Sequence, residues 1–238
     1  MTNKRIIALV AIMSVAISAG TLYAQGDLPA EERKVEPFSR LAVAVPGNVY
    51  LVQGSEQRVI VEGTARVLEN LVTEVRNGRL TVRTRPRWRF RRNDQLNIYL
   101  TMPEIDGISL SGSASVHAEG SVQTQKLSVV ISGSGRVNIE ELVADALDVT
   151  VSGSGRLNIG KGPKLEKSKI VISGSGRIDT GNLPVGILDA SISGSGNCRV
   201  HVLTDLNVRI SGSGRVIYTG NPLIDARISG SGRIVTAD

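Results

Sequence analysis

From residue 107 onward, apolar side chains recur at every second position of short segments. Leu127, Val129 and Ile131 form one such series, and Leu147, Val149 and Val151 repeat it. A period of two is that of a β-strand and not of a helix. The pattern therefore predicts short strands, each with one face turned into a core.

A recurring tetrapeptide follows these strands. Ser-Gly-Ser-Gly or a near copy begins at residues 111, 132, 152, 173, 193, 211 and 229, in steps of 18 to 21 residues. A unit this short cannot bury its apolar face alone, so each must stack on its neighbours as one coil of a solenoid. Strands that pair with the same strands of the next coil predict a parallel β-helix, with about 4.8 Å per coil.

The alternation continues through the tetrapeptide and assigns its glycines to the inside. If Ile131 points inward, Gly133 and Gly135 do so too, whereas Ser132 and Ser134 point outward. Glycine in a coil wall indicates a sharp corner without room for a side chain. The tetrapeptide is therefore interpreted as structural and not as a phosphate-binding loop, because no Lys followed by Ser or Thr comes after the glycines.

Arginine follows the tetrapeptide directly in five copies and is expected to form an outward column, called here the arginine column. Its members are Arg136, Arg156, Arg177, Arg215 and Arg233. Like charges stacked at coil spacing repel each other. We expect nearby acidic residues to neutralise the column, namely Asp148, Asp179, Asp189 and Asp225. The alternative is a stripe that binds a ligand.

Residues 35–105 are rich in β-type segments but lack the regular repeat. The expected strands are 41–45, 49–53, 58–62, 71–76, 79–84 and 95–102. Asn77 and Gly78 form a two-residue turn signal between two of them. An open coil stack exposes a strand edge, so this part is expected to continue the solenoid and cap its N-terminal end. Residues 25–238 are thus one domain, with an irregular part at 35–105 and coils at 106–238.

The first 24 residues carry the features of a secretory signal peptide. Lys4 and Arg5 precede an apolar run from Ile6 to about Ala19, and Ala24 is a small residue suited to cleavage. The alternative, a membrane anchor, is disfavoured because the run is short for a spanning helix. No transmembrane span is expected in the mature chain.

Composition argues against several classes of function. Without Lys4 and Arg5 the chain has 26 basic and 22 acidic residues, a net charge of +4, which is too balanced for a dedicated nucleic-acid binder. One cysteine cannot form an internal disulfide, and Cys198 occupies an inward position. With two histidines and one cysteine, neither a metal site nor a cofactor is expected.

A second basic feature lies before the repeats. Six arginines fall within ten residues, interleaved with Trp88 and Phe90: Arg83, Arg85, Arg87, Arg89, Arg91 and Arg92. Planar guanidinium groups suit phosphate or carboxylate, so the run is a candidate anion-binding loop. The alternative is a solvated strand pair whose charges protect a sheet edge from aggregation.

The sequence also resembles a known family. The segments FSRLAVAVPGNVYLVQG, LVTEVRNGRLTVRT and LNIYLTMPEIDGISLSGSASV, followed by the serial SGSG copies, resemble the head GIN domain family, which is named for auto-transporter adhesins. The resemblance covers nearly all of the mature chain. It implies a right-handed parallel β-helix on an exported bacterial protein, with a role in adhesion. The shared motifs are structural and imply no catalytic residue.

These observations favour an exported, non-catalytic β-helix that acts in adhesion or cell-envelope interaction. The expected location is the periplasm or the cell surface of a Gram-negative bacterium. The expected partner is an anionic envelope polymer or another surface protein, and a homo-oligomer is compatible with the sequence. The alternative function is that of a polysaccharide-active lyase or hydrolase, which only the analogy of fold supports.

Overall fold

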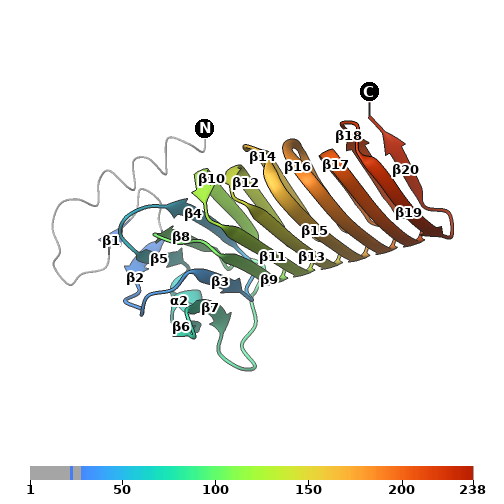
Figure 1. Cartoon of the computed structure of the whole chain (residues 1–238). Helices are drawn as coiled ribbons and strands as arrows, with labels where there is room; N and C mark the ends of the chain where they lie inside the picture. Colours follow the sequence, from blue (N-terminus) through green and yellow to red (C-terminus); the bar gives the residue numbers. More distant parts are fainter. Residues whose placement is uncertain (1–21, 24–27, 238) are drawn as a thin grey trace.

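The computed structural model describes residues 22–23 and 28–237 and shows a parallel β-solenoid (Figure 1). Strands of successive coils stack in register into two ladders. The chain turns from the first ladder into the second at the Ser-Gly-Ser-Gly tetrapeptides. The predicted fold class is confirmed. The predicted signal peptide, residues 1–24, lies outside the described residues except for β1 (Leu22–Tyr23).

The two ladders contain the strands on either side of this corner. In spatial order, the first ladder contains β7 (Arg79–Thr84), β3 (Arg40–Val43), β9 (Gly107–Gly112), β11 (Lys126–Gly133), β13 (Ala146–Gly153), β15 (Leu165–Gly174), the second halves of β16 (Arg177–Gly194) and β17 (Asn197–Gly212), and β19 (Leu223–Ser229). The second ladder contains β8 (Leu96–Met102), β4 (Asn48–Gln53), β10 (Ser115–Gln123), β12 (Arg136–Val143), β14 (Arg156–Lys161), the first halves of β16 and β17, β18 (Arg215–Thr219) and β20 (Arg233–Thr236).

The interior is a set of stacked aliphatic side chains. Leu110, Ile131, Val151, Ile172, Ile192 and Ile210 form one continuous column, because each pairs with the next across the first ladder. Each of them is at most 2% exposed to solvent. Removal of this apolar surface from water is the main favourable term for such a fold.

The two glycines of each corner have different steric roles. Gly174 has a φ of +117°, and a Cβ placed there would lie 2.6 Å from the carbonyl oxygen of Gly153 in the preceding coil. Gly155 has an ordinary φ, but a Cβ there would lie 2.5 Å from Cγ2 of Ile131. The first glycine therefore provides a backbone conformation and a close coil contact. The second leaves space for the aliphatic column.

The N-terminal part caps the solenoid with antiparallel strands. β5 (Arg58–Gly63) pairs antiparallel with β8 and with β2 (Pro29–Glu32), and β6 (Leu71–Arg76) forms a hairpin with β7. The short helix α2 (Ala65–Leu68) connects β5 to the hairpin, and β1 pairs with β2. The predicted cap is therefore present. Among the described residues, no helix has the length and apolar character needed to cross a membrane.

Spatial order differs from chain order in this cap. β7 and β8 form the outermost coil, yet β3 and β4, which precede them in the sequence, form the next one. After β8 the chain enters β9 and β10, which stack on β3 and β4 from the other side. The six strands expected here exist with boundaries shifted by at most two residues, whereas β2, α2 and this threading were not expected.

Cys198 lies in the second ladder between Ile178 and Val216 and is 1% exposed. Its inward assignment is confirmed. Burial, and to a lesser extent the nearby charge of Asp179, raises the pKa of its thiol to about 12. The thiol is therefore protonated and covered at neutral pH, which makes it a poor nucleophile.

The aliphatic column predicts a sharp difference between adjacent positions. Ile131→Asp places an unpaired carboxylate in the dry interior and should lower the free energy of unfolding by about 4 kcal/mol or more. Val130→Asp is the matched control, because Val130 is half-buried and lies on the other face of the same strand. Urea denaturation followed by circular dichroism measures both. Similar stability of the two variants would show that the interior does not depend on this column.

Burial of the Cys198 thiol predicts its reactivity. The native protein should react with a thiol-specific reagent such as dithionitrobenzoate only as fast as it unfolds, and the denatured protein should react at once. Absorbance at neutral pH, with and without guanidinium chloride, follows the reaction. Rapid stoichiometric labelling of the native protein would place the thiol at the surface.

Candidate functional site

The clustered arginines lie on an enlarged corner of the outermost coil. β7 ends at Thr84 in the first ladder and β8 begins at Leu96 in the second, so residues 85–95 span the corner. Residues 44–47 occupy the same place in the next coil, and Ser-Gly-Ser-Ala at 111–114 in the one after it. We call residues 85–95 the arginine loop.

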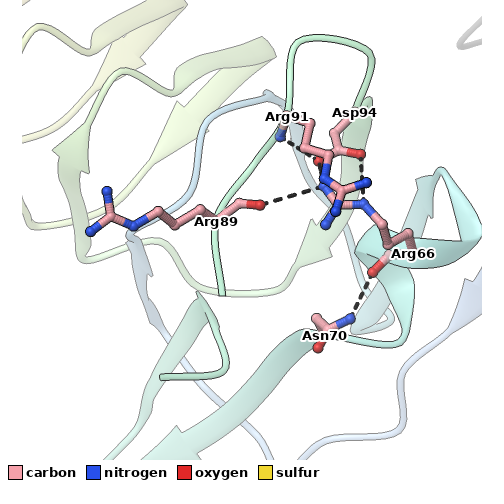
Figure 2. A network of polar contacts seen from close by, with 5 residues as sticks. All are labelled: Arg66, Asn70, Arg89, Arg91 and Asp94. Carbon is pink, nitrogen blue, oxygen red and sulfur yellow. Dashed lines mark hydrogen bonds and ion pairs between the residues drawn. The ribbon is translucent and has the colours of Figure 1, made fainter. Parts of the chain in front are cut away.

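Contacts of Asp94 hold the arginine loop together (Figure 2). Nε of Arg66 donates to Oδ1 of Asp94 at 3.3 Å, its Nη2 forms a close ion pair with Oδ2, and the backbone N–H of Arg91 donates to Oδ2 at 2.6 Å. Nη2 of Arg66 also donates to the carbonyl oxygen of Arg89 at 3.4 Å. The loop contributes the side chain of Asp94 and otherwise only backbone atoms to these contacts. The guanidinium of Arg89 points away from them.

The electrostatic setting of Asp94 follows from these contacts. Burial of its side chain, which is 7% exposed, would by itself raise the pKa of the carboxyl group. The N–H of Arg91 and the guanidinium of Arg66 outweigh this effect and hold the pKa of Asp94 below its usual value. The carboxylate is therefore charged at neutral pH and fully engaged in holding the loop.

Aromatic rings attach the loop to the body of the protein. Trp88 and Phe90 meet edge to face with ring centroids 4.9 Å apart, and both pack against the hydrophobic core. The guanidinium carbon of Arg66 lies 4.6 Å from the centroid of the Trp88 ring, within the range of a cation–π contact. The alternating sequence thus sends rings inward and arginines outward.

The six predicted site residues divide into two groups. Arg83 is still in β7, and its Nε donates to Oε1 of Glu74 at 3.0 Å. The other five are exposed and form no side-chain ion pair within the described residues: Arg85, Arg87, Arg89, Arg91 and Arg92. Arg87 has a φ of +65°, a conformation that non-glycine residues adopt mostly where the surroundings impose it.

The structure does not show, for residues 85–95, the strand pair that the alternative interpretation assumes. Residues 85–95 form no strand, and β7 is flanked by β3 and β6 and so has no free edge. Residues 91–94 of the loop line an open hollow of about 860 Å³ together with Thr64 and Arg66. Among the described residues, Asp94 is the only carboxylate in the lining of this hollow, and it is already paired.

The arginine column lies beside the same edge of the solenoid. Arg136, Arg156 and Arg177 are direct neighbours in the second ladder, Asn197 follows, and Arg215 and Arg233 complete the series. All five arginines are exposed. In the three coils nearest the N-terminal cap, the equivalent residues are Asn97, Asn48 and Ser115. The loop and the column therefore belong to one corner edge.

The expected neutralisation of the column does not occur among the described residues. Oδ2 of Asp148 lies 2.6 Å from Nζ of Lys126, Asp189 accepts a hydrogen bond from Asn207, and Asp179 accepts one from the N–H of Gly181. Asp225 forms no ion pair within the part of the chain described. Asp148, Asp179 and Asp189 therefore have other partners, and no ion pair neutralises the arginine column within the described residues.

A stack of rings beside the column was not predicted from the sequence. The rings of Tyr50 and Tyr99 stack with centroids 5.2 Å apart, and the ring of His117 stacks on Tyr50 at 5.8 Å. Oε2 of Glu62 accepts hydrogen bonds from Tyr99 Oη and Asn97 Nδ2. Desolvation, then the charges of Glu119 and Glu62, raise the pKa of Tyr50. These residues lie far apart in sequence, and only the ladder register brings them together.

Within the described residues, no group of three or more His, Cys, Asp or Glu side chains is arranged to hold a metal ion. The site is thus a set of exposed guanidinium groups that form no ion pair among the described residues, and those of the arginine loop stand on a backbone held by Asp94 and Arg66. Such an arrangement can bind phosphate, sulfate or carboxylate groups through charge-assisted hydrogen bonds.

Comparison with protein families and solved structures places these features in context. The family model described as "Putative auto-transporter adhesin, head GIN domain" matches residues 37–222. A "putative adhesin" from Bacteroides fragilis has a TM-score of 0.83 and 25% identity, with 89% of this chain and 97% of that chain covered. A search of curated proteins found none that matches.

Two structures with lower identity share the fold. A "putative lipid binding protein" from Parabacteroides distasonis has a TM-score of 0.74 and 22% identity, with 90% of this chain and 98% of that chain covered. A "putative adhesin" from Parabacteroides merdae has a TM-score of 0.69 and 18% identity, again over 90% and 98% of the two chains. The solenoid with its N-terminal cap is thus a shared architecture.

Proposed function

This chain belongs to the head GIN domain family, and from that premise we propose that it is an exported, non-catalytic adhesion module whose basic corner edge binds an anionic polymer of the cell envelope. The observation that carries the proposal is the corner edge itself. Five exposed arginines of the arginine loop and five of the arginine column lie along it without acidic partners among the described residues. A linear polyanion could follow this edge over several coils.

The way the arginine loop is fixed favours binding over simple solvation. Asp94 and Arg66 hold the loop backbone, and Trp88 and Phe90 attach it to the core. Side chains on a held backbone lose less conformational freedom on binding than side chains on a mobile segment. Five like charges within eight residues also repel each other, so a ligand that neutralises them removes an unfavourable interaction.

The leader and the family support export to the cell envelope. The basic start, apolar run and small residue at Ala24 support secretion, and the family is named for auto-transporter adhesins. The periplasm or cell surface of a Gram-negative bacterium supplies suitable partners in lipopolysaccharide and acidic polysaccharides. Another surface protein with an acidic patch is the alternative partner.

The competing function, a polysaccharide-active enzyme, has less support. Glycoside hydrolysis ordinarily requires two carboxyl groups on either side of the bond to be broken. In the hollow beside the arginine loop, Asp94 is the only carboxylate that the described part of the chain supplies, and it is already bonded to Arg66 and to the N–H of Arg91. This geometry suits anion binding and gives no pair of acid and base.

The proposal predicts a loss of binding without a loss of stability. Replacing Arg87, Arg89 and Arg91 together by Ser leaves the backbone contacts to Asp94 and Arg66 intact, because those contacts do not use these side chains. We expect affinity for immobilised lipopolysaccharide to fall at least about tenfold at low salt, while the unfolding midpoint stays nearly unchanged. Binding of the native protein should also fade by 1 M salt, where screening acts over about 3 Å.

A matched variant separates the basic edge from overall charge. Lys164, Lys167 and Lys169 are exposed on and next to β15. Their replacement by Ser removes the same number of positive charges at a place away from the corner. This variant should bind nearly as well as the native protein. If both variants lose affinity equally, or if neither does, the corner edge is not the binding site.

A further inference from the structure

The C-terminal end of the solenoid is open, unlike the capped N-terminal end. β19 pairs only with β17, and β20 only with β18, within the described residues. All seven residues of β19 are exposed. Ile224 and Ile228 are each 44% exposed, whereas Leu206 and Ile210, which occupy the same positions one coil earlier, are at most 2% exposed. Figure 1 shows β19 and β20 as the outermost strands of this end.

Apolar exposure in this molecule is concentrated on this coil. Of the six large hydrophobic residues exposed in the described structure, four lie there: Leu223, Ile224, Ile228 and Val235. Surfaces of this kind, next to free strand edges, are typical of interaction sites.

The backbone at this end has free hydrogen-bonding groups in a known direction. Within the solenoid, the backbone groups of residues at inward positions form hydrogen bonds with the next coil. The carbonyl oxygens of Ala114 and Gly133, for example, accept hydrogen bonds from the N–H groups of Arg136 and Ser154, both at 2.9 Å. In β19 the equivalent residues are Ile224, Ala226 and Ile228. Their N–H and C=O groups therefore face the open end, where buried groups of this type require partners.

The sequence of β19 is complementary to itself in the antiparallel direction. If two copies of the strand pair about Ala226, Ile224 of one copy lies opposite Ile228 of the other, on the inward side. Asp225 then lies opposite Arg227, on the outward side. Neither Asp225 nor Arg227 has an ion-pair partner within the described chain. Opposite charges placed directly across two strands stabilise their pairing.

We propose that two copies of this chain join through their open ends, by antiparallel pairing of β19 with β19, into a two-fold symmetric dimer. Parallel, end-to-end growth is disfavoured because antiparallel β5, β2 and β6 cap the other end. The two-fold arrangement pairs the exposed edge of β19 in each copy and ends there, because both copies use the same strand. It places the two basic corner edges in one particle, which raises the avidity of binding.

Sedimentation velocity on the mature chain tests the dimer, with a charge swap as the internal control. The native protein should sediment as a dimer at micromolar concentration. Asp225→Arg places two arginines opposite each other in both symmetric pairs and should raise the dissociation constant at least about tenfold. The double variant Asp225→Arg with Arg227→Asp restores both pairs and should restore the dimer.

Both residues are exposed, so neither change should disturb folding, and circular dichroism checks this. A monomeric native protein at high micromolar concentration would overturn the proposal, as would a dimer that Asp225→Arg leaves unchanged. A double variant that stays monomeric while folded would overturn the antiparallel register. These outcomes concern mass alone, so they are independent of polymer binding at the corner edge.

Discussion

The stacking of glycine on glycine at the corner is the constraint on which the solenoid depends. From the second tetrapeptide onward, a Cβ on the first glycine would lie 2.6 to 2.7 Å from the carbonyl oxygen of its counterpart one coil earlier, and φ at these glycines is between +107° and +118°. No L-residue with a Cβ fits both conditions without strain. This contact fixes where the chain turns, and the register of both ladders follows from it. The aliphatic column and the outward serines and arginines then take their places by alternation.

The same corner accounts for the position of the candidate site. A solenoid tolerates insertions between strands, because a loop that leaves the corner does not change the pairing of the strands on either side. The coil of β7 and β8 lies at the capped end of the solenoid. Its corner is not a Ser-Gly-Ser-Gly tetrapeptide and is enlarged into the arginine loop. The arginine column lies one residue past the corner in later coils. Architecture and binding surface are therefore two consequences of one turn, which explains how basic residues more than 100 positions apart come to share an edge.

Sequence alone predicted the parts of the fold in which neighbours along the chain are also neighbours in space. The tetrapeptide spacing indicated the coils, and alternation placed Ile131 and Cys198 inside and Arg136 outside. It did not predict that β7 and β8 form the end coil and β3 and β4 the coil next to it, because no local signal encodes the order in which irregular strands stack. The prediction that acidic side chains pair with the arginine column was wrong for a related reason, since Asp148 pairs with Lys126 of the neighbouring coil. The ring stack of Tyr99, Tyr50 and His117 depends on that same order.

The stability of a corner variant tests this account most directly. Gly174→Ala forces a Cβ against the Gly153 carbonyl oxygen at a φ of +117°, whereas Ser175→Ala alters the exposed neighbouring position of the same corner. Chemical denaturation should show a loss of about 2 to 4 kcal/mol for the glycine variant and less than about 0.5 kcal/mol for the serine variant. Equal stability of the two variants would contradict the view that the glycine contact determines the coil.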